Sequence, residues 1–153
     1  MNREEIAKQN LKAYEGLGRT FEVQQMFFDP EQYKEGMIIT IKEAKSFAGQ
    51  EAGQQFQPET SFEEKSVQIV FNCDNKVLAH KVNYQDTDEV ETLSAVEGED
   101  EYLVPAGTHF EITSASSEDD LNEEGFFEVD IDQIGEEDYQ EAITNGATEI
   151  YDI

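Results

Sequence analysis

The stretch EDEYLVPAGTHFEI, residues 99–112, decides the fold. Its apolar run ends at Pro105 and Gly107, residues that stop a strand and favour a turn. Alternation of apolar and polar residues resumes at His109, as in a second strand. The pattern therefore predicts two strands joined by a tight turn at the centre of the domain.

Two carboxylates, Glu99 and Glu101, lie at the entrance to the first of these strands. Because alternate residues of an extended strand share a face, both side chains are expected to point the same way. They are the first candidates for chemistry in this chain, since paired acids can activate or stabilise a reacting group.

The rest of the chain predicts an α+β fold with strands in mixed or antiparallel pairing and short peripheral helices. At 153 residues it is expected to form one domain. Its expected parts are an N-terminal helix (1–18), a core (19–113) and an acidic C-terminal extension (114–153). Within these parts we expect strands over 21–28, 37–42, 126–131 and 148–153, an Asp29-Pro30 helical turn, a hairpin over 66–82 and a helix over 136–145. Residues 46–56 are expected to form a loop that passes into a helical turn, and residues 58–65, 83–97 and 114–124 to form loops.

Charge is the strongest compositional feature. Asp and Glu number 36 against 10 Lys and Arg, which gives a formal net charge of -26. From Val82 onward the chain has 23 acids and no Lys or Arg. Such a field repels nucleic acid and acidic membranes and attracts basic partners. The alternative is an acidic surface that only solvates the protein, as in adaptation to high salt.

Several classes of site are disfavoured by composition. The single cysteine, Cys73, lies among apolar residues and is expected to be a small buried side chain rather than a nucleophile. One cysteine with His80 and His109 does not make a metal site at these spacings, so no metal is expected. No apolar run has the length of a membrane span, and the expected location is the cytoplasm, that of the host cell if a phage encodes the protein.

Glu99-x-Glu101, followed by Tyr102 and LVPAGTHFEI, resembles the last motif of the ADP-ribosyltransferase exoenzymes of the arginine–serine–glutamate class. The resemblance extends upstream to FDPEQYKEGMIITIKEAKSFAGQEAGQQF, where Ser46 falls on the first serine of the family's Ser-Thr-Ser motif and Ala52 and Phe56 fit later positions. It covers about residues 21–56 and 67–113 and implies an ADP-ribosyltransferase-like fold.

The resemblance also implies roles for individual residues. Glu101 falls on the catalytic glutamate, which stabilises the positive charge that develops as nicotinamide leaves NAD. Glu99 falls on the acid that helps to activate an acceptor, and Ser46 on a serine that positions NAD. An active enzyme would use NAD as cofactor, with Arg19 on its phosphates.

Other positions depart from the family pattern. The family's arginine falls on Gln24-Gln25, and a neutral amide cannot replace a charged, bidentate phosphate donor. Phe47 and Ala48 replace the Thr and the second Ser, and Ala44 replaces an aromatic residue. These departures and the net charge favour, as a first hypothesis, a protein without catalytic activity or cofactor.

In this hypothesis the protein blocks a basic nucleic-acid-binding protein, such as a restriction or CRISPR nuclease, by imitating the phosphate backbone, as phage and mobile-element anti-defence inhibitors do. It binds neither nucleic acid nor membrane directly. The expected partner-binding residues are the acids of the C-terminal part: Asp119, Asp120, Glu123, Glu124, Glu128, Asp130, Asp132, Glu136, Glu137 and Asp138. The alternative hypothesis is an active mono-ADP-ribosyltransferase with Glu101, Glu99, Ser46 and Arg19 in the roles above.

Overall fold

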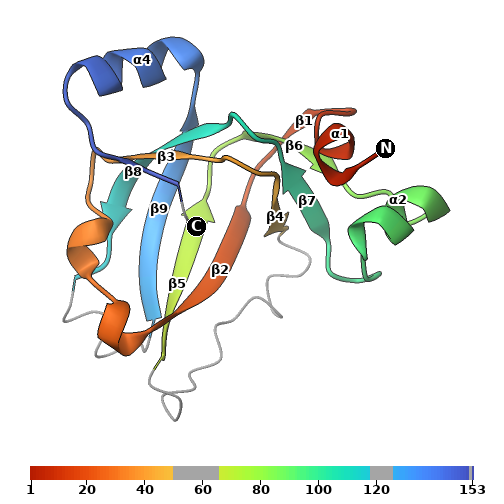
Figure 1. The fold of residues 1–153 in the computed structure, drawn as a ribbon, viewed down its shortest axis with the longest axis horizontal. Coiled ribbons are helices and arrows are strands. Elements are labelled where there is room, and N and C mark those ends of the chain that lie inside the picture. Colours follow the sequence, from red (N-terminus) through yellow and green to blue (C-terminus); the bar gives the residue numbers. More distant parts are fainter. Residues whose placement is uncertain (50–65, 118–125, 152) are drawn as a thin grey trace.

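The fold is α+β, as the sequence predicts, and is dominated by one large sheet (Figure 1). The computed structural model describes residues 1–49, 66–117, 126–151 and 153. The strands are β1 (Lys12–Tyr14), β2 (Leu17–Gln24), β3 (Ile38–Thr40), β4 (Lys45–Ala48), β5 (Ser66–Cys73), β6 (Val77–Lys81), β7 (Glu101–Val104), β8 (His109–Ala115), β9 (Phe126–Ile134) and β10 (Glu149–Ile150). The helices are α1 (Arg3–Ala7), α2 (Thr87–Leu93) and α4 (Glu136–Thr144), with 3₁₀ turns η1 (Gln25–Phe27) and η2 (Pro30–Gln32).

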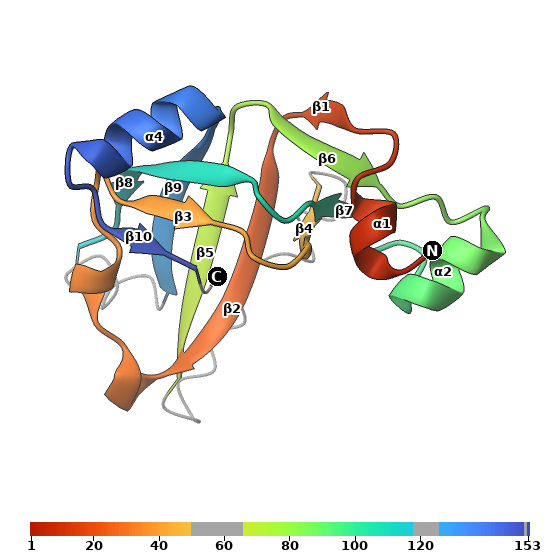
Figure 2. The ribbon, with the colours of Figure 1, turned by 45° about the horizontal axis from the view of Figure 1, so that its top comes forward.

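The sheet has the strand order β1-β6-β7-β4-β2-β5-β9-β8-β3-β10 and is mostly antiparallel. Its two halves meet between β4 and β2, where Gly18 opposite Ala48 is the one register pair. We call β1, β6, β7 and β4 the small half and the other six strands the large half. Helices α1 and α2 lie beside the small half, whereas α4 lies beside the large half (Figure 2). The junction of the halves therefore brings β2, β4 and β7 together.

The buried apolar side chains form two clusters. The main cluster spans both halves of the sheet and includes fully buried Phe71, Phe110 and Phe127 of the large half and Val77 of β6. Phe47 of β4 stacks on Phe110 of β8, with ring centroids 5.9 Å apart. A second cluster joins α1 and α2 to the small half and consists of Ile6, Ala7, Ala44, Val82, Leu93 and Leu103. Apolar packing thus ties both sides of the junction to β4.

Local signals account for several elements at the expected places. In β9, buried Phe127, Val129 and Ile131 alternate with more exposed residues, which is the period of a half-buried strand. The Asp29 side chain accepts a hydrogen bond from the Glu31 amide and caps η2, with Pro30 at its first position. The predicted helix over 136–145 is confirmed as α4, and Gly146 follows it with φ +89.

The two predicted hairpins are wrong in pairing, although their strands exist. β7 pairs with β4 and β6, whereas β8 pairs with β3 and β9. Likewise β5 pairs with β2 and β9, so neither of its edges is free for β6. The two strands of each predicted hairpin therefore lie in different halves of the sheet, because other strands fill the edges at which they would pair.

Boundaries near the start of the chain also differ from expectation. The helix predicted over 1–18 ends at Ala7, and Asn10 takes a left-handed φ of 48° before β1 pairs with β6. β2 starts at Leu17 and ends at Gln24, so residues 25–27 form η1 instead of continuing the strand. The loop expected from Ser46 contains β4, which pairs with β7.

Two further corrections concern later segments. Residues 87–93, expected in a loop, form α2 because the Asp86 side chain accepts hydrogen bonds from the amides of Asp88 and Glu89. The C-terminal part is not an extension of the core: β9 lies inside the sheet between β5 and β8. Residues 50–65 and 118–125, which include the expected positions Ala52 and Phe56 and the loop before Ser66, lie outside the described residues. No helix in the described ranges is both long and apolar enough to cross a membrane.

Candidate functional site at the junction of the two halves

Ser46 and Glu101 meet where the two halves of the sheet join. Ser46 lies on β4 and Glu101 begins β7, and the antiparallel register sets Ala48 opposite Glu101. The Ser46 hydroxyl donates a hydrogen bond to Glu101 Oε2 at 2.8 Å. Glu101 is 9% exposed, so its carboxylate is largely shielded from water. The two residues that the sequence resemblance selected independently are therefore in direct contact.

Arg19 reaches the same point from β2. Its Nη1 donates to the Ser46 backbone oxygen at 2.9 Å, and its Nε donates to the Ile153 backbone oxygen at 3.0 Å. Arg19 follows Gly18, the residue that pairs with Ala48 across the junction. The contact between the two halves therefore sets the guanidinium beside Ser46.

Arg3, the first residue of α1, is a second cation at this site. Its Nη2 donates to Ser46 Oγ at 2.9 Å, and its Nε donates to the Ala44 backbone oxygen at 3.3 Å. Sequence reasoning missed Arg3, because 43 positions separate it from Ser46 and it belongs to no spaced motif. Both arginines thus bind Ser46, one at the hydroxyl and the other at the carbonyl.

The backbone around Glu101 is fixed as well. The Tyr84 hydroxyl accepts a hydrogen bond from the Glu101 amide at 3.0 Å, and the Glu101 carbonyl accepts one from Val82 N at 3.0 Å. The alternation predicted that Glu99 and Glu101 share a face of one strand, and the structure differs. Glu99 is exposed and precedes β7, because Asp100 between the two residues has a left-handed φ of 48° that interrupts the strand.

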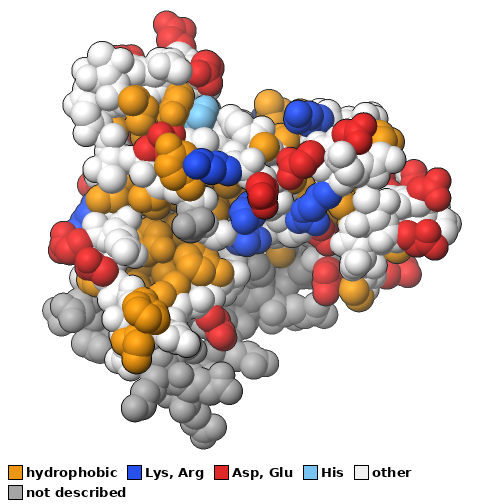
Figure 3. Space-filling view, viewed as in Figure 1, with side chains coloured by type: hydrophobic (Ala, Val, Ile, Leu, Met, Phe, Trp, Pro, Cys, Tyr) orange, Lys and Arg blue, Asp and Glu red, His pale blue; other side chains and the backbone are white. Residues whose placement is uncertain are grey.

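Two guanidinium groups and the Glu101 carboxylate lie at the junction. Burial lowers the pKa of Arg19, and the charge of Arg3 lowers it further. Two guanidinium groups repel one another, so an anion between them is attracted by both. Lys and Arg side chains lie across the middle of the face shown in Figure 3 with a few Asp and Glu side chains between them, whereas more Asp and Glu side chains lie at its edges. Positive and negative side chains therefore lie together near the centre of this face.

The departures from the family motif have identifiable positions. Gln24 ends β2, five residues after Arg19, and is exposed. Phe47, in place of a threonine, is 2% exposed and belongs to the main core. Ala44, in place of an aromatic residue, is buried in the second core and receives contacts from α1 through its backbone. Phe47 and Ala44 thus serve packing, and Ser46 between them faces the polar site.

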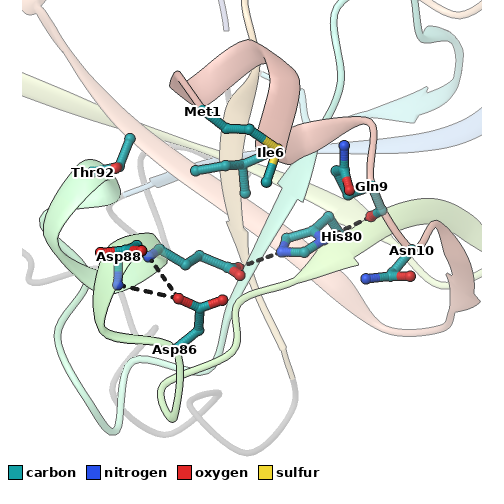
Figure 4. Close-up of a pocket in the computed structure, with 9 residues that line it drawn as sticks. Met1, Ile6, Gln9, Asn10, His80, Asp86, Asp88 and Thr92 are labelled. Atoms are coloured by element: carbon teal, nitrogen blue, oxygen red, sulfur yellow. Dashed lines mark hydrogen bonds and ion pairs between the residues drawn. The ribbon is translucent and has the colours of Figure 1, made fainter.

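A separate pocket of about 260 Å³ lies between α1, β6 and α2 (Figure 4). Buried His80 contacts the Gln9 backbone oxygen through Nδ1 at 2.7 Å and the Glu89 carboxylate through Nε2. Glu89 also accepts from the Asn83 amide at 3.1 Å. These contacts join the end of α1 to β6 and α2, so the histidine serves the attachment of both helices. The described part of the chain has no group of His, Cys, Asp and Glu arranged to hold a metal ion.

The structure describes six of the ten acidic residues that the sequence predicts to bind a partner. Asp119, Asp120, Glu123 and Glu124 lie outside the described residues. Glu128, Asp130 and Asp132 alternate along β9 with its buried residues and share the opposite face. Glu136, Glu137 and Asp138 are exposed in the first turn of α4, where negative charge complements the helix dipole. These six acids, called here the acidic face, lie on elements other than those of the Ser46–Glu101 site.

No protein-family model matches the sequence, and no curated protein matches it. Among solved structures, the chain is similar to the Vis toxin, an ADP-ribosyltransferase from Vibrio splendidus, with a TM-score of 0.53 and 13% identity over 91% of this chain and 55% of that one. It is also similar to ADP-ribosyltransferase Vis in complex with agmatine, with a TM-score of 0.50 and 14% identity over 82% and 52% of the two chains. The chain thus spans about half the length of these structures. This protein has an ADP-ribosyltransferase-like fold.

Proposed function

We propose that the protein is a mono-ADP-ribosyltransferase that uses NAD. The observation that carries the proposal is the hydrogen bond of 2.8 Å from Ser46 Oγ to Glu101 Oε2, with Arg19 bound to Ser46 on the neighbouring strand. An arginine, a serine and a glutamate from three separate strands meet at one point in a fold similar to that of the Vis enzyme. The first hypothesis from the sequence assumed that the arginine was lost at Gln24-Gln25, and Arg19 supplies that cation instead.

The residues present suit the chemistry of NAD. The guanidinium group of Arg19 suits the diphosphate, since arginine donates charge-assisted hydrogen bonds to such groups. When NAD reacts, the bond between nicotinamide and ribose breaks, and a carboxylate stabilises the positive charge left on the ribose. The largely buried Glu101 carboxylate is the group for this role, because its charge acts more strongly where water is excluded. Exposed Glu99 is free to approach an acceptor.

The test is NAD hydrolysis and transfer of labelled ADP-ribose by the purified chain. Glu101→Gln should lower kcat at least about 100-fold, since removal of one group that stabilises developing charge costs about this much. The Kd for NAD should stay within about threefold, because NAD binding is assigned to Arg19. Glu97→Gln, an exposed acid outside the site, is the matched control. Absence of NAD binding to the wild-type protein at millimolar concentration would refute the proposal.

The acidic face supports a second candidate function. Three carboxylates on one side of β9 and three at the start of α4 form the part of the C-terminal acidic region that the structure describes. We propose that this face engages a basic nucleic-acid-binding protein, with an anti-defence inhibitor of a nuclease as the setting. Such a contact weakens as salt rises. If a basic target bound this protein and its own nucleic acid at the same time, imitation of the phosphate backbone would be the wrong account.

A further inference from the structure

Helix α1 is attached to the strand that carries Ser46. Asn2 and Glu5 form a capping box at its start, and Ile6 and Ala7 are buried in the second core cluster. Glu4 Oε1 accepts a hydrogen bond from the Ala44 amide at 2.8 Å. The helix therefore has anchors that do not depend on Arg3, and its first residue is held close to β4.

Arg3 contacts this strand at two points. Its Nε donates to the Ala44 carbonyl at 3.3 Å, so Arg3 and Glu4 together bind both polar groups of one backbone residue. Its Nη2 extends past Ala44 to Ser46 Oγ at 2.9 Å. The two contacts fix the position and plane of the guanidinium relative to the serine.

The direction of the hydrogen bonds follows from the chemistry of the groups. A guanidinium can only donate, so Ser46 Oγ must accept from Arg3. A hydroxyl has a single hydrogen, and Glu101 Oε2 lies 2.8 Å from the same oxygen. The Ser46 hydrogen therefore points to Glu101, and the carboxylate receives a donor in a fixed direction. Arg19 contacts Ser46 at its carbonyl oxygen and not at its hydroxyl, so it does not impose this orientation.

We propose that Arg3 is a positioning residue of the site, which holds the Ser46 hydroxyl as a hydrogen-bond donor to Glu101. This inference deepens the proposed function and rests on it for its kinetic consequence. Arg3 acts through Ser46, so the expected effect of its loss is on turnover rather than on NAD affinity. The position of Ser46 Oγ, on which its hydrogen bond to Glu101 depends, is a feature of the protein itself and can be measured without NAD.

The first test is NMR of the Ser46 Hα–Hβ scalar couplings, which report the χ1 rotamer, in the chain without NAD. The wild type should show one rotamer, and Arg3→Met should show averaged couplings. Glu4→Met removes the other Ala44 contact, and Lys8→Met removes a charge from the exposed C-cap of the same helix. Both controls should keep the wild-type couplings. Unchanged couplings in Arg3→Met would overturn the proposal.

The second test is the kinetics of NAD hydrolysis. Arg3→Met should lower kcat by about tenfold or more with KM for NAD within about twofold, as expected for an interaction realised in the transition state. Arg3→Lys retains a donor and should recover at least about a third of wild-type kcat. A large rise in KM with unchanged kcat would instead assign Arg3 to the NAD phosphates. If the wild type hydrolysed no NAD, the proposed function would fail, and the couplings would still decide the role of Arg3.

Discussion

Arg19 is the residue whose replacement tests both the architecture and the proposed cofactor site. Its two hydrogen bonds connect β2 to β4 at Ser46 and to the Ile153 backbone. Arg19→Met keeps most of the aliphatic side chain and removes both bonds. Hydrogen bonds from charged groups contribute about 1.5–3 kcal/mol each to stability. The loss from removing both bonds is smaller than twice this value, because Arg19 is partly exposed and its removal relieves its repulsion with Arg3. We expect the free energy of unfolding to fall by about 2–4 kcal/mol.

Urea denaturation of the wild type and the variant measures this difference, and calorimetric titration with NAD measures the second effect. Loss of a paired arginine–phosphate contact of about 2–3 kcal/mol should weaken NAD binding by about 30- to 150-fold. Arg19→Lys, which retains charge but not the planar fork, should lie between the two proteins. Lys76→Met removes an exposed cation in the turn before β6 and is the matched control. An Arg19→Met protein with wild-type urea midpoint and wild-type NAD affinity would refute the reasoning.

Two further predictions follow from titrating groups. Burial, with the nearby Asp132 charge, raises the pKa of Cys73 to about 12. A thiol reagent at pH 8 should therefore label the protein after unfolding but not in its native state. Rapid labelling of the folded chain would contradict this prediction. The pKa of Glu149 is lowered from 4.5: burial alone would raise it, but hydrogen bonds from the hydroxyls of Thr40, Tyr139 and Tyr151 outweigh this. The Glu149 carboxylate thus stabilises the fold above its ordinary pKa, and this contribution is lost as pH falls through the lowered value. In thermal unfolding, Glu149→Gln should therefore be less stable than the wild type at neutral pH, and this difference in stability should shrink below pH 4.5. A deficit equal at pH 3 and pH 7 would be the contrary result, with Glu141→Gln as control.

Local structure was the most predictable part of the fold. β9 and α4 lie where alternation and helix signals indicated, because β9 buries one face and α4 ends at a glycine with positive φ. The short range of such signals also explains the errors. Pro105 and Gly107 do end β7, but whether β7 and β8 pair depends on which strands fill their edges. No turn signal contains that information.

The site was predictable only where a motif covered it. Ser46 and Glu101 were found through spaced motifs, and the structure brings them into contact. The motif sets the family's arginine at Gln24-Gln25 and leaves Arg19 as the phosphate ligand of the alternative hypothesis only, whereas the structure sets Arg19 beside Ser46. Arg3 carried no sequence signal, because its contact depends on how α1 packs on Ala44 through apolar neighbours. A contact that depends only on tertiary packing, such as that of Arg3 with Ser46, leaves no pattern in the sequence.

The position of Ile153 has a practical consequence for experiments on this protein. Its side chain is 5% exposed in the main core, and its carbonyl accepts a hydrogen bond from Arg19. Residues fused directly after it, such as an affinity tag, would begin next to the group proposed to grip the cofactor. A purification handle attached before Met1 would begin close to Arg3, which contacts Ser46, so the binding measurements described above should use protein from which any handle has been cleaved.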